Sequence, residues 1–321
     1  MYQKNIINKF NQYFHQKMGM YDYTRGWGKF PVCPNCGRED KFGIHLGDNR
    51  TNCFVCGYQI KPIDLIMAKE GLETKVELWS YLKAFEGLEY LEPKRIDRKE
   101  IPTIALPESF HSLSNTSNQF GKAAYNYLKN KRGLNPEVLA KRGYGYCTEG
   151  KLLGYIIIPF YQRNRLIYYI GRTFLDLGVK FYNPEESEIG IGKSHILYNI
   201  DSLALYDDIY LVESVMNAET LGEEAIVTLG KFVSNYQLGL ILRSEIKSLT
   251  IILDPDAYDK SLQLGLKLTP YKKIRIVNLP EGEDVNSLGY EETKKIIDKT
   301  NFMNYRQIWN LKEEYGRKHH V

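Results

Sequence analysis

The sequence predicts a multidomain chain that combines the α+β and α/β classes: a small cysteine-rich β module, a basic α+β region, and an α/β region with a parallel sheet. Three observations support this fold class: two closely spaced cysteine pairs, a central pair of long apolar runs joined by a short polar turn, and apolar runs that alternate with helical segments after residue 200. Strand alternating with helix implies parallel strands with right-handed crossovers. We expect a cysteine-rich domain at 1–90, a linker at 91–120, a basic subdomain at 121–200, a parallel-sheet subdomain at 201–290 and a helical tail at 291–321.

The composition indicates a globular chain without a membrane segment. Of the 321 residues, 43% are hydrophobic and 26% are charged, which is enough apolar material for a core. No apolar stretch approaches the roughly 20 residues needed to span a bilayer. The N-terminus, Met1 to Asn5, lacks the apolar core of a signal peptide. We therefore expect a cytoplasmic protein whose five cysteines are metal ligands or core residues rather than disulfides.

The two cysteine pairs predict one structural zinc site. Cys33 and Cys36 are separated by two residues, as are Cys53 and Cys56, and each pair is followed by glycine. Two such turns supply four thiolates for a tetrahedral ion. Chance pairing or disulfides are the alternatives. Because the site is closed, its metal would stabilise a domain too small for a core of its own.

The residues around the cysteines mix cations with aromatic rings, which suits single-stranded nucleic acid. Of these aromatic residues, we expect Phe42, Phe54 and Tyr58 to pack the small domain instead. Downstream, a segment rich in serine, asparagine and proline marks the linker.

The basic region contains two strand-like runs joined by Gln162 to Arg165, which is typical of a hairpin turn. Cations stand at strand ends and turns, where they can reach a substrate: Arg163, Arg165, Arg172, Lys180 and Lys193. Residues 121–200 hold 12 Lys/Arg against 6 Asp/Glu, whereas residues 201–300 hold 11 against 17. A basic half beside an acidic half suits an enzyme that handles polyphosphate or nucleic acid, although solvated faces explain such a bias too.

Two short apolar runs in the acidic half each end in carboxylates. Residues 209–212 stop at Glu213, and residues 249–253 stop at Asp254 and Asp256. Ligand sites in parallel sheets lie at the carboxyl ends of the strands. Converging carboxylates call for a hard cation, and one or two Mg²⁺ or Mn²⁺ ions suit them.

Other interpretations of these acidic residues are local. Asp254-Pro255-Asp256 would also make a turn that caps a helix. Asp284, in a later acidic stretch, either completes the metal site or lies in an exposed loop.

Taken in order, these blocks resemble the DnaG-type primases of bacteria and bacteriophages over roughly residues 30–290. The similarity includes Arg132-Gly133-Leu134, Ile158-Pro159-Phe160, Gly171-Arg172, Lys180 with Asn183, Lys193 to Tyr198, Glu213, Asp254 with Asp256, and Leu279 to Asp284. The sequence departs from the family pattern at Ser214, where the family usually has glycine, and at Asn217 and Asn286, where it has aspartate; the middle residue of Asp-x-Asp is Pro255. Fewer carboxylates would weaken metal binding.

The resemblance implies a TOPRIM fold for the parallel-sheet subdomain and a function in DNA replication. The chain would synthesise RNA primers on single-stranded DNA from ribonucleoside triphosphates, with Glu213, Asp254 and Asp256 holding the catalytic metal and Asp284 as a candidate further ligand. The cations and Asn183 would contact nucleotide or template, and the zinc ribbon would contact the template's start. A replicative helicase would be a partner, and a polymerase or single-strand-binding protein is a further candidate. The lack of a helicase-binding region suggests a minimal primase of bacteriophage origin, working in the host cytoplasm.

Two other classes of function share some of these features. TOPRIM acids also occur in nucleases and topoisomerases, which cut nucleic acid, but a topoisomerase needs a further DNA-binding domain. A non-catalytic zinc-ribbon adaptor of the replisome would explain the departures at Ser214, Asn217 and Pro255, but the intact acidic trio opposes it.

Overall fold

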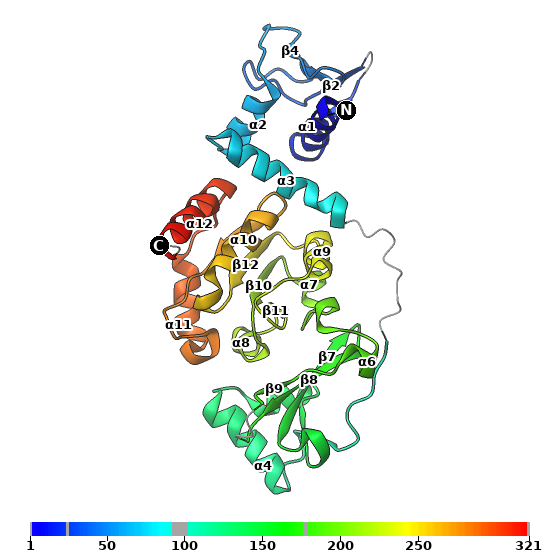
Figure 1. Ribbon diagram of the computed structural model, residues 1–321, viewed down its shortest axis with the longest axis vertical. Helices are drawn as coiled ribbons and strands as arrows, with labels where there is room; N and C mark the ends of the chain where they lie inside the picture. Colours follow the sequence, from blue (N-terminus) through cyan, green and yellow to red (C-terminus); the bar gives the residue numbers. More distant parts are fainter. Residues whose placement is uncertain (1, 24–25, 92–101, 176–178, 320–321) are drawn as a thin grey trace. The chain divides into compact units, whose positions relative to one another are not determined.

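The computed structural model describes residues 2–23, 26–91, 102–175 and 179–319. The chain divides into two compact units (Figure 1). The first takes in residues 1–90, 266–271 and 304–321, and the second takes in residues 91–265 and 272–303. The predicted fold class is confirmed: an N-terminal antiparallel sheet carries the cysteines, an antiparallel α+β subdomain follows, and a four-stranded parallel α/β sheet of the TOPRIM type comes last.

The first unit combines a small antiparallel sheet with four helices. The strands pair in chain order, with the first cysteine turn between β2 and β3 and the second cysteine turn directly after β4. The strands are β1 (Tyr21–Asp22), β2 (Trp27–Lys29), β3 (Phe42–His45) and β4 (Thr51–Cys53), and the helices are α1 (Tyr2–Met18), α2 (Pro62–Glu70), α3 (Lys75–Leu91) and α12 (Tyr305–His319). Gly71 ends α2 in the left-handed conformation at φ 67°, which separates it from α3.

Aromatic side chains form the core of this unit. Phe14, Phe30 and Phe42 are buried and contact one another in series, while Tyr81 contacts Tyr305 of α12 edge to face. The expectation that Phe54 packs inside is wrong, because 54% of its surface is exposed. Phe54 lies within the second cysteine turn, where the chain turns back too tightly for that side chain to reach the core.

The second unit begins with a five-stranded antiparallel sheet in the order β5-β6-β7-β8-β9. Its strands are β5 (Phe110–Ser112), β6 (Gly145–Cys147), β7 (Tyr155–Gln162), β8 (Arg165–Thr173) and β9 (Phe181–Tyr182). The predicted hairpin joins β7 to β8, with Arg163 and Asn164 at φ 49° and 61°, the left-handed pair typical of a two-residue turn. In the segment expected as a linker, residues 92–101 lie outside the described residues, and β5 pairs with β6.

Short helical segments surround this sheet. They are α4 (Gln119–Asn126), the π-helical turn η2 (Tyr127–Lys131), α5 (Pro136–Lys141), the 3-10 turns η3 (Gly150–Leu152) and η4 (Lys193–His195), α6 (Glu186–Ile189) and α7 (Ser202–Leu205). Asn118 caps α4 by accepting a hydrogen bond from the Gly121 amide at 2.8 Å.

The parallel sheet of the second unit has the order β11-β10-β12-β13. Its strands are β10 (Asp208–Val212), β11 (Ala225–Val227), β12 (Ser248–Ile252) and β13 (Lys273–Ile276), and its helical segments are α8 (Val215–Leu221), α9 (Asn235–Arg243), η5 (Pro255–Ala257), α10 (Tyr258–Leu268) and α11 (Val285–Lys299). The central strands β10 and β12 are the two apolar runs that precede the carboxylates. Val212 pairs with Ile252, so both strands end at the same edge. Ser234 caps α9 through a capping box with Gln237.

Across the described parts of the chain, no helix has both the length and the apolar character that a membrane span requires.

Candidate functional site

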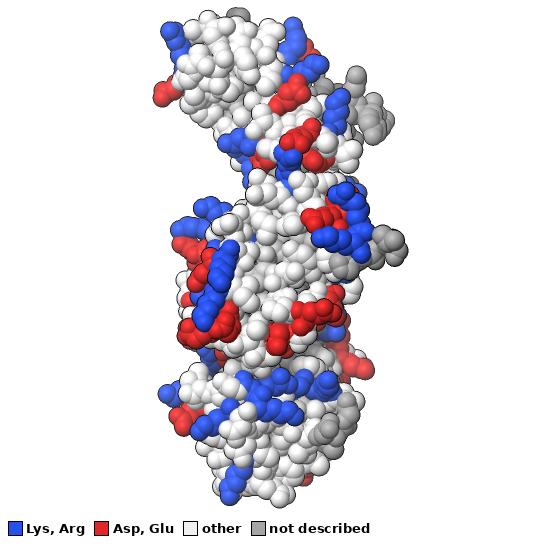
Figure 2. Space-filling model, turned by 90° about the vertical axis from the view of Figure 1, so that its left-hand side faces the viewer, with Lys and Arg blue, Asp and Glu red and all other residues white. Residues whose placement is uncertain are grey.

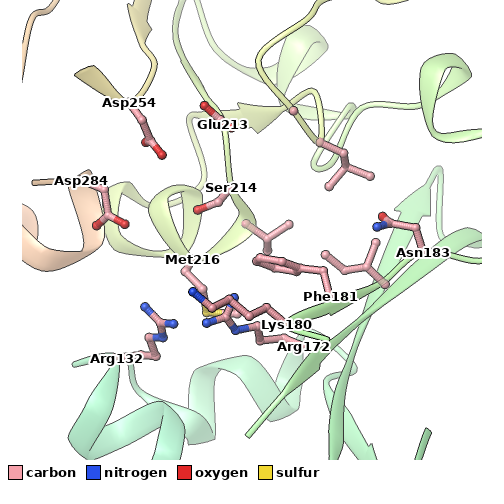
Figure 3. A pocket seen from close by; sticks show the side chains of 14 residues that line it. Arg132, Arg172, Lys180, Phe181, Asn183, Glu213, Ser214, Met216, Asp254 and Asp284 are labelled. Atoms are coloured by element: carbon pink, nitrogen blue, oxygen red, sulfur yellow. The ribbon is translucent and has the colours of Figure 1, made fainter. Parts of the chain in front are cut away.

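The carboxyl edge of the parallel sheet opens into a pocket of about 500 Å³ within the second unit (Figure 3). Glu213 follows β10, Asp254 follows β12, and Asp284 is the N-cap of α11. All three carboxylates line the pocket, and we call them the acidic wall. The sheet order produces this arrangement, because adjacent parallel strands deliver the residues that follow them to one edge.

Two carboxylate oxygens of the acidic wall have no hydrogen-bond partner among the described residues. Oε2 of Glu213 and Oδ1 of Asp254 are buried and accept no hydrogen bond. Burial, followed by the negative charge of Asp254, raises the pKa of Glu213 to about 7. Burial and then the charge of Asp284 raise the pKa of Asp254. Buried charges of one sign are costly until a cation or proton neutralises them.

These acids fit a divalent cation that keeps much of its water. No three acidic side chains of the described residues bring their oxygens within 4.8 Å of one another, as the cysteines do. Magnesium is commonly held by one or two carboxylates with water and phosphate oxygens completing its shell. The two unpartnered oxygens of Glu213 and Asp254 are therefore the ligands that the acidic wall best offers.

Cations line the opposite side of the same pocket. Arg132 follows the turn η2, Arg172 lies on β8, and Lys180 precedes β9. We call these three residues the basic wall. In Figure 3 their side chains reach toward the pocket from the antiparallel sheet and its helices, opposite Glu213 and Asp254. The Arg172 guanidinium lies 4.4 Å from the centre of the Phe181 ring, an arrangement that fixes its plane.

The surface shows the same opposition of charge. In Figure 2, Asp and Glu side chains gather at the height of α8 and α11, and Lys and Arg side chains gather below them at the height of β8 and β9. In a site with carboxylates on one side and guanidinium groups on the other, a phosphate ester can lie between a metal ion bound to the carboxylates and the guanidinium groups, which donate hydrogen bonds to its oxygens.

Of the remaining residues predicted for the site, one lines this pocket and four do not. Asn183 also lines it. Asp256 is exposed and forms an ion pair with Lys231. Arg163 and Arg165 are exposed at the β7–β8 turn, and Lys193 is exposed on η4; none of these four lines the pocket.

Sequence reasoning missed Arg132 as a site residue. Its signal was the Arg132-Gly133-Leu134 motif, which marks the end of a helix rather than a substrate contact. Only the fold brings it to the pocket. The Arg132 Nε donates to the Tyr127 hydroxyl at 2.9 Å, and the Arg172 Nε donates to the same oxygen at 3.0 Å. One buried tyrosine thus holds both arginines of the basic wall.

The four cysteines of the first unit form a cluster whose sulfur atoms all lie within 4.8 Å of one another. Sγ of Cys33 is 3.9 Å from that of Cys56, and Sγ of Cys36 is 3.8 Å from that of Cys53. A regular tetrahedron of Zn–S bonds near 2.3 Å has edges of about 3.8 Å, so the cluster fits zinc.

Backbone contacts prepare this cluster for a metal. The amides of Gly37 and Gly57 donate to the carbonyls of Cys33 and Cys53 at 3.0 Å, with each glycine in the left-handed region. Hydrogen bonding from the Tyr58 amide, then from the Asn35 side chain, lowers the pKa of Cys56 to about 6. A thiolate is the form that binds metal.

Comparisons with known proteins agree with this architecture. No protein-family model matches the chain. The chain is 25% identical over 296 residues to a DNA primase of Pseudomonas aeruginosa, an alignment that covers 74% of this chain and 44% of the primase. The chain therefore spans less than half the length of that relative.

Solved structures with a similar fold are catalytic parts of primases. A DnaG catalytic core matches with a TM-score of 0.52 at 20% identity, over 60% of this chain and 77% of that core. A DnaG primase catalytic domain bound to ssDNA matches with a TM-score of 0.51 at 18% identity, over 71% of this chain and 81% of that domain. The chain therefore has the catalytic-core fold of the DnaG-type primases, the family that its sequence resembles.

Proposed function

We propose that the chain is a DNA primase that joins ribonucleoside triphosphates into short RNA primers on a single-stranded DNA template. The observation that carries the proposal is the pocket in which the acidic and basic walls face each other. It lies at the carboxyl edge of a parallel sheet, in a unit with the fold of a DnaG catalytic core. Nucleotidyl transfer needs both kinds of side chain, because a triphosphate carries several negative charges that must be neutralised.

In this proposal Glu213 and Asp254 hold Mg²⁺ or Mn²⁺, with Asp284 beside them and Asp256 at the rim. The metal, when bound, supplies positive charge for the triphosphate and acidifies the attacking 3′-hydroxyl. Arg132, Arg172 and Lys180 bind the phosphate oxygens and so hold the α-phosphorus in line with the attacking 3′-hydroxyl.

The exposed cations outside the pocket would serve the template. Arg163, Arg165 and Lys193 lie on turns that carry no ion pair among the described residues, so their charge is available to a phosphate backbone. That a DnaG primase catalytic domain has been solved with ssDNA is consistent with this part of the proposal.

The zinc ribbon would help the first bond to form. Trp27, Lys29 and the exposed Phe54 lie around the cysteine cluster, and rings beside cations suit unstacked bases. Joining two free nucleotides has the largest entropic barrier of primer synthesis, so a second contact to the template matters most at that step. A replicative helicase is the further partner we propose.

The proposal is tested by primer synthesis on defined templates. Wild type and Asp254→Asn are incubated with labelled ribonucleotides, Mg²⁺ or Mn²⁺ and a pool of single-stranded DNA oligonucleotides, and the products are separated on a gel. Asp298→Asn is a matched control, because Asp298 is exposed and lies outside the pocket. We expect template-dependent oligoribonucleotides with wild type and Asp298→Asn, and none with Asp254→Asn. Cleaved template would instead identify a nuclease, and an inactive wild type with intact template would favour a non-catalytic adaptor.

A further inference from the structure

A single amide side chain joins the helices that carry the acidic wall. Asn286 lies in the first turn of α11, two residues after Asp284. Its backbone N–H donates to Oδ1 of Asn217 on α8 at 3.1 Å, and its Nδ2 donates to Oγ1 of Thr220 on the same helix at 2.9 Å. Asn217 is 1% exposed, whereas Asn286 and Thr220 are half-buried. Because α8 begins one residue after Ser214, the junction also restrains the segment that carries Glu213.

The same amide reaches the basic wall. Nδ2 of Asn286 donates to the backbone carbonyl of Arg132 at 2.8 Å, and Nη1 of Arg132 lies 3.5 Å from Oδ1 of Asn286. Arg132 then donates from Nε to the Tyr127 hydroxyl, which also accepts from Arg172. A continuous set of hydrogen bonds therefore runs from α8 and α11 through Asn286 to both arginines that line the pocket.

The chemistry of the junction requires an amide. The Thr220 hydroxyl donates its own proton to the Met216 carbonyl at 2.9 Å, so its oxygen can only accept from Asn286. The Arg132 carbonyl is also an acceptor. Both hydrogens of the Asn286 amide are thus used, and neither an acidic nor an apolar side chain could supply them.

We propose that Asn286 is a positioning residue that couples the two walls of the pocket, so that occupation of the acidic wall by a divalent cation moves or stiffens Arg132 and Arg172. The inference rests on the proposed function for the presence of that cation. A cation held by Glu213 and Asp254, with Asp284 beside it, would act on the segments that begin α8 and α11, and Asn286 is bonded to both helices and to Arg132. Cation binding would then prepare the arginines for a triphosphate.

The test follows the arginine side chains directly. The 321-residue chain, labelled with ¹⁵N-arginine, is titrated with Mg²⁺. The Nε–H signals of Arg132 and Arg172 are recorded and are assigned through the Arg132→Lys and Arg172→Lys variants. Mg²⁺ binding is measured separately by calorimetry. In the wild type we expect both signals to shift with the calorimetric midpoint. In Asn286→Ala, which adds no charge, we expect Mg²⁺ to bind while the shifts fall to less than about a third of the wild-type values.

Asn199→Ala is the matched control. Nδ2 of Asn199 also donates two hydrogen bonds, to the carbonyls of Glu223 at 2.7 Å and Ala225 at 3.1 Å, but Asn199 does not line the pocket. Its loss should lower stability and leave the arginine shifts intact. Should Asn286→Ala fail to fold, Thr220→Val serves in its place, because it removes the acceptor on α8 of the Asn286 amide and keeps the shape of the side chain.

The outcomes separate this inference from the function on which it rests. The coupling is overturned if the arginine signals of the wild type do not shift when Mg²⁺ binds, or if they shift as far in Asn286→Ala or its substitute as in the wild type. Either result leaves the primase proposal standing. Absence of Mg²⁺ binding overturns both. Primer synthesis lost in Asn286→Ala with wild-type arginine shifts would assign Asn286 another role and also refute the inference.

Discussion

Replacing Glu213 by glutamine should make the metal-free protein more stable at alkaline pH while removing its ability to bind the catalytic metal. The pKa of Glu213 is raised from its ordinary value of 4.5 to about 7 by burial and by the charge of Asp254. The folded state therefore holds a proton that the unfolded state has already lost between these two values. Its stabilising contribution is complete below pH 4.5 and is lost as the pH rises through about 7.

The magnitude follows from the same shift. Each pKa unit corresponds to about 1.4 kcal/mol, so the shift amounts to about 3 kcal/mol, and partial exposure of the carboxyl reduces the expected effect to about 1–2 kcal/mol. Glutamine keeps the shape and cannot ionise. Relative to wild type, Glu213→Gln should therefore gain about 1–2 kcal/mol of unfolding free energy at pH 8 and almost nothing at pH 4.5.

Urea denaturation in EDTA at both pH values, followed by circular dichroism, measures this difference. Addition of Mg²⁺ at pH 8 should raise the unfolding free energy of the wild type and leave that of Glu213→Gln unchanged. The variant lacks the Glu213 carboxylate, which is one of the two that offer an unpartnered oxygen to the metal. Equal stability of the two proteins at pH 8 without metal would show that Glu213 is ionised at no cost, and the electrostatic account of the acidic wall would be refuted.

Three further predictions concern the rest of the chain. Cys33→Ser with Cys36→Ser should lower the zinc content by one equivalent and unfold the small antiparallel sheet, as measured by atomic absorption and circular dichroism; retained zinc would contradict the tetrathiolate site. Arg142→Met should lower the unfolding free energy by about 3 kcal/mol in urea denaturation. The substitution removes the cation that lies 2.5 Å from the Glu219 carboxylate, which is 2% exposed and keeps only the Tyr144 and Tyr198 hydroxyls as partners; a loss below 1 kcal/mol, as for a surface pair, would count against a buried pair. Gly145→Ala should lower the unfolding free energy by about 2 kcal/mol or more, because a Cβ there would overlap the His111 carbonyl of the paired strand. An unchanged denaturation midpoint would show that β5 and β6 can move apart without loss of stability.

The strands of the parallel sheet could be predicted from the sequence because their signal is local. The runs at 209–212 and 249–253 are short, apolar and bounded by polar residues, and they became β10 and β12 with ends shifted by one residue. Strand type and chain order then placed Glu213 and Asp254 at one edge through a general property of parallel sheets. The cysteine spacing predicted the cluster in the same way.

The outward position of Asp256 and the role of Asn286 had no local signal. Pro255 begins the turn η5, which interrupts the strand periodicity, so spacing from Asp254 no longer tells where Asp256 points. Asn286 contacts Arg132, 154 positions away in the chain, and its hydrogen bonds depend on how α8, α11 and the antiparallel sheet pack. Contacts of that kind are products of the fold, and no pattern of neighbouring residues encodes them.

The first unit is built from segments that are synthesised far apart in time. Its N-terminal part ends near residue 90, yet Phe85 stacks on Tyr271 and Tyr81 contacts Tyr305 of α12. At a translation rate of about 5–20 residues per second, the roughly 215 intervening residues take about 10–40 s to emerge. During that interval the ribbon has its metal ligands but lacks part of its aromatic core. Zinc captured early by the cysteines would protect the nascent segment until the end of the chain completes it.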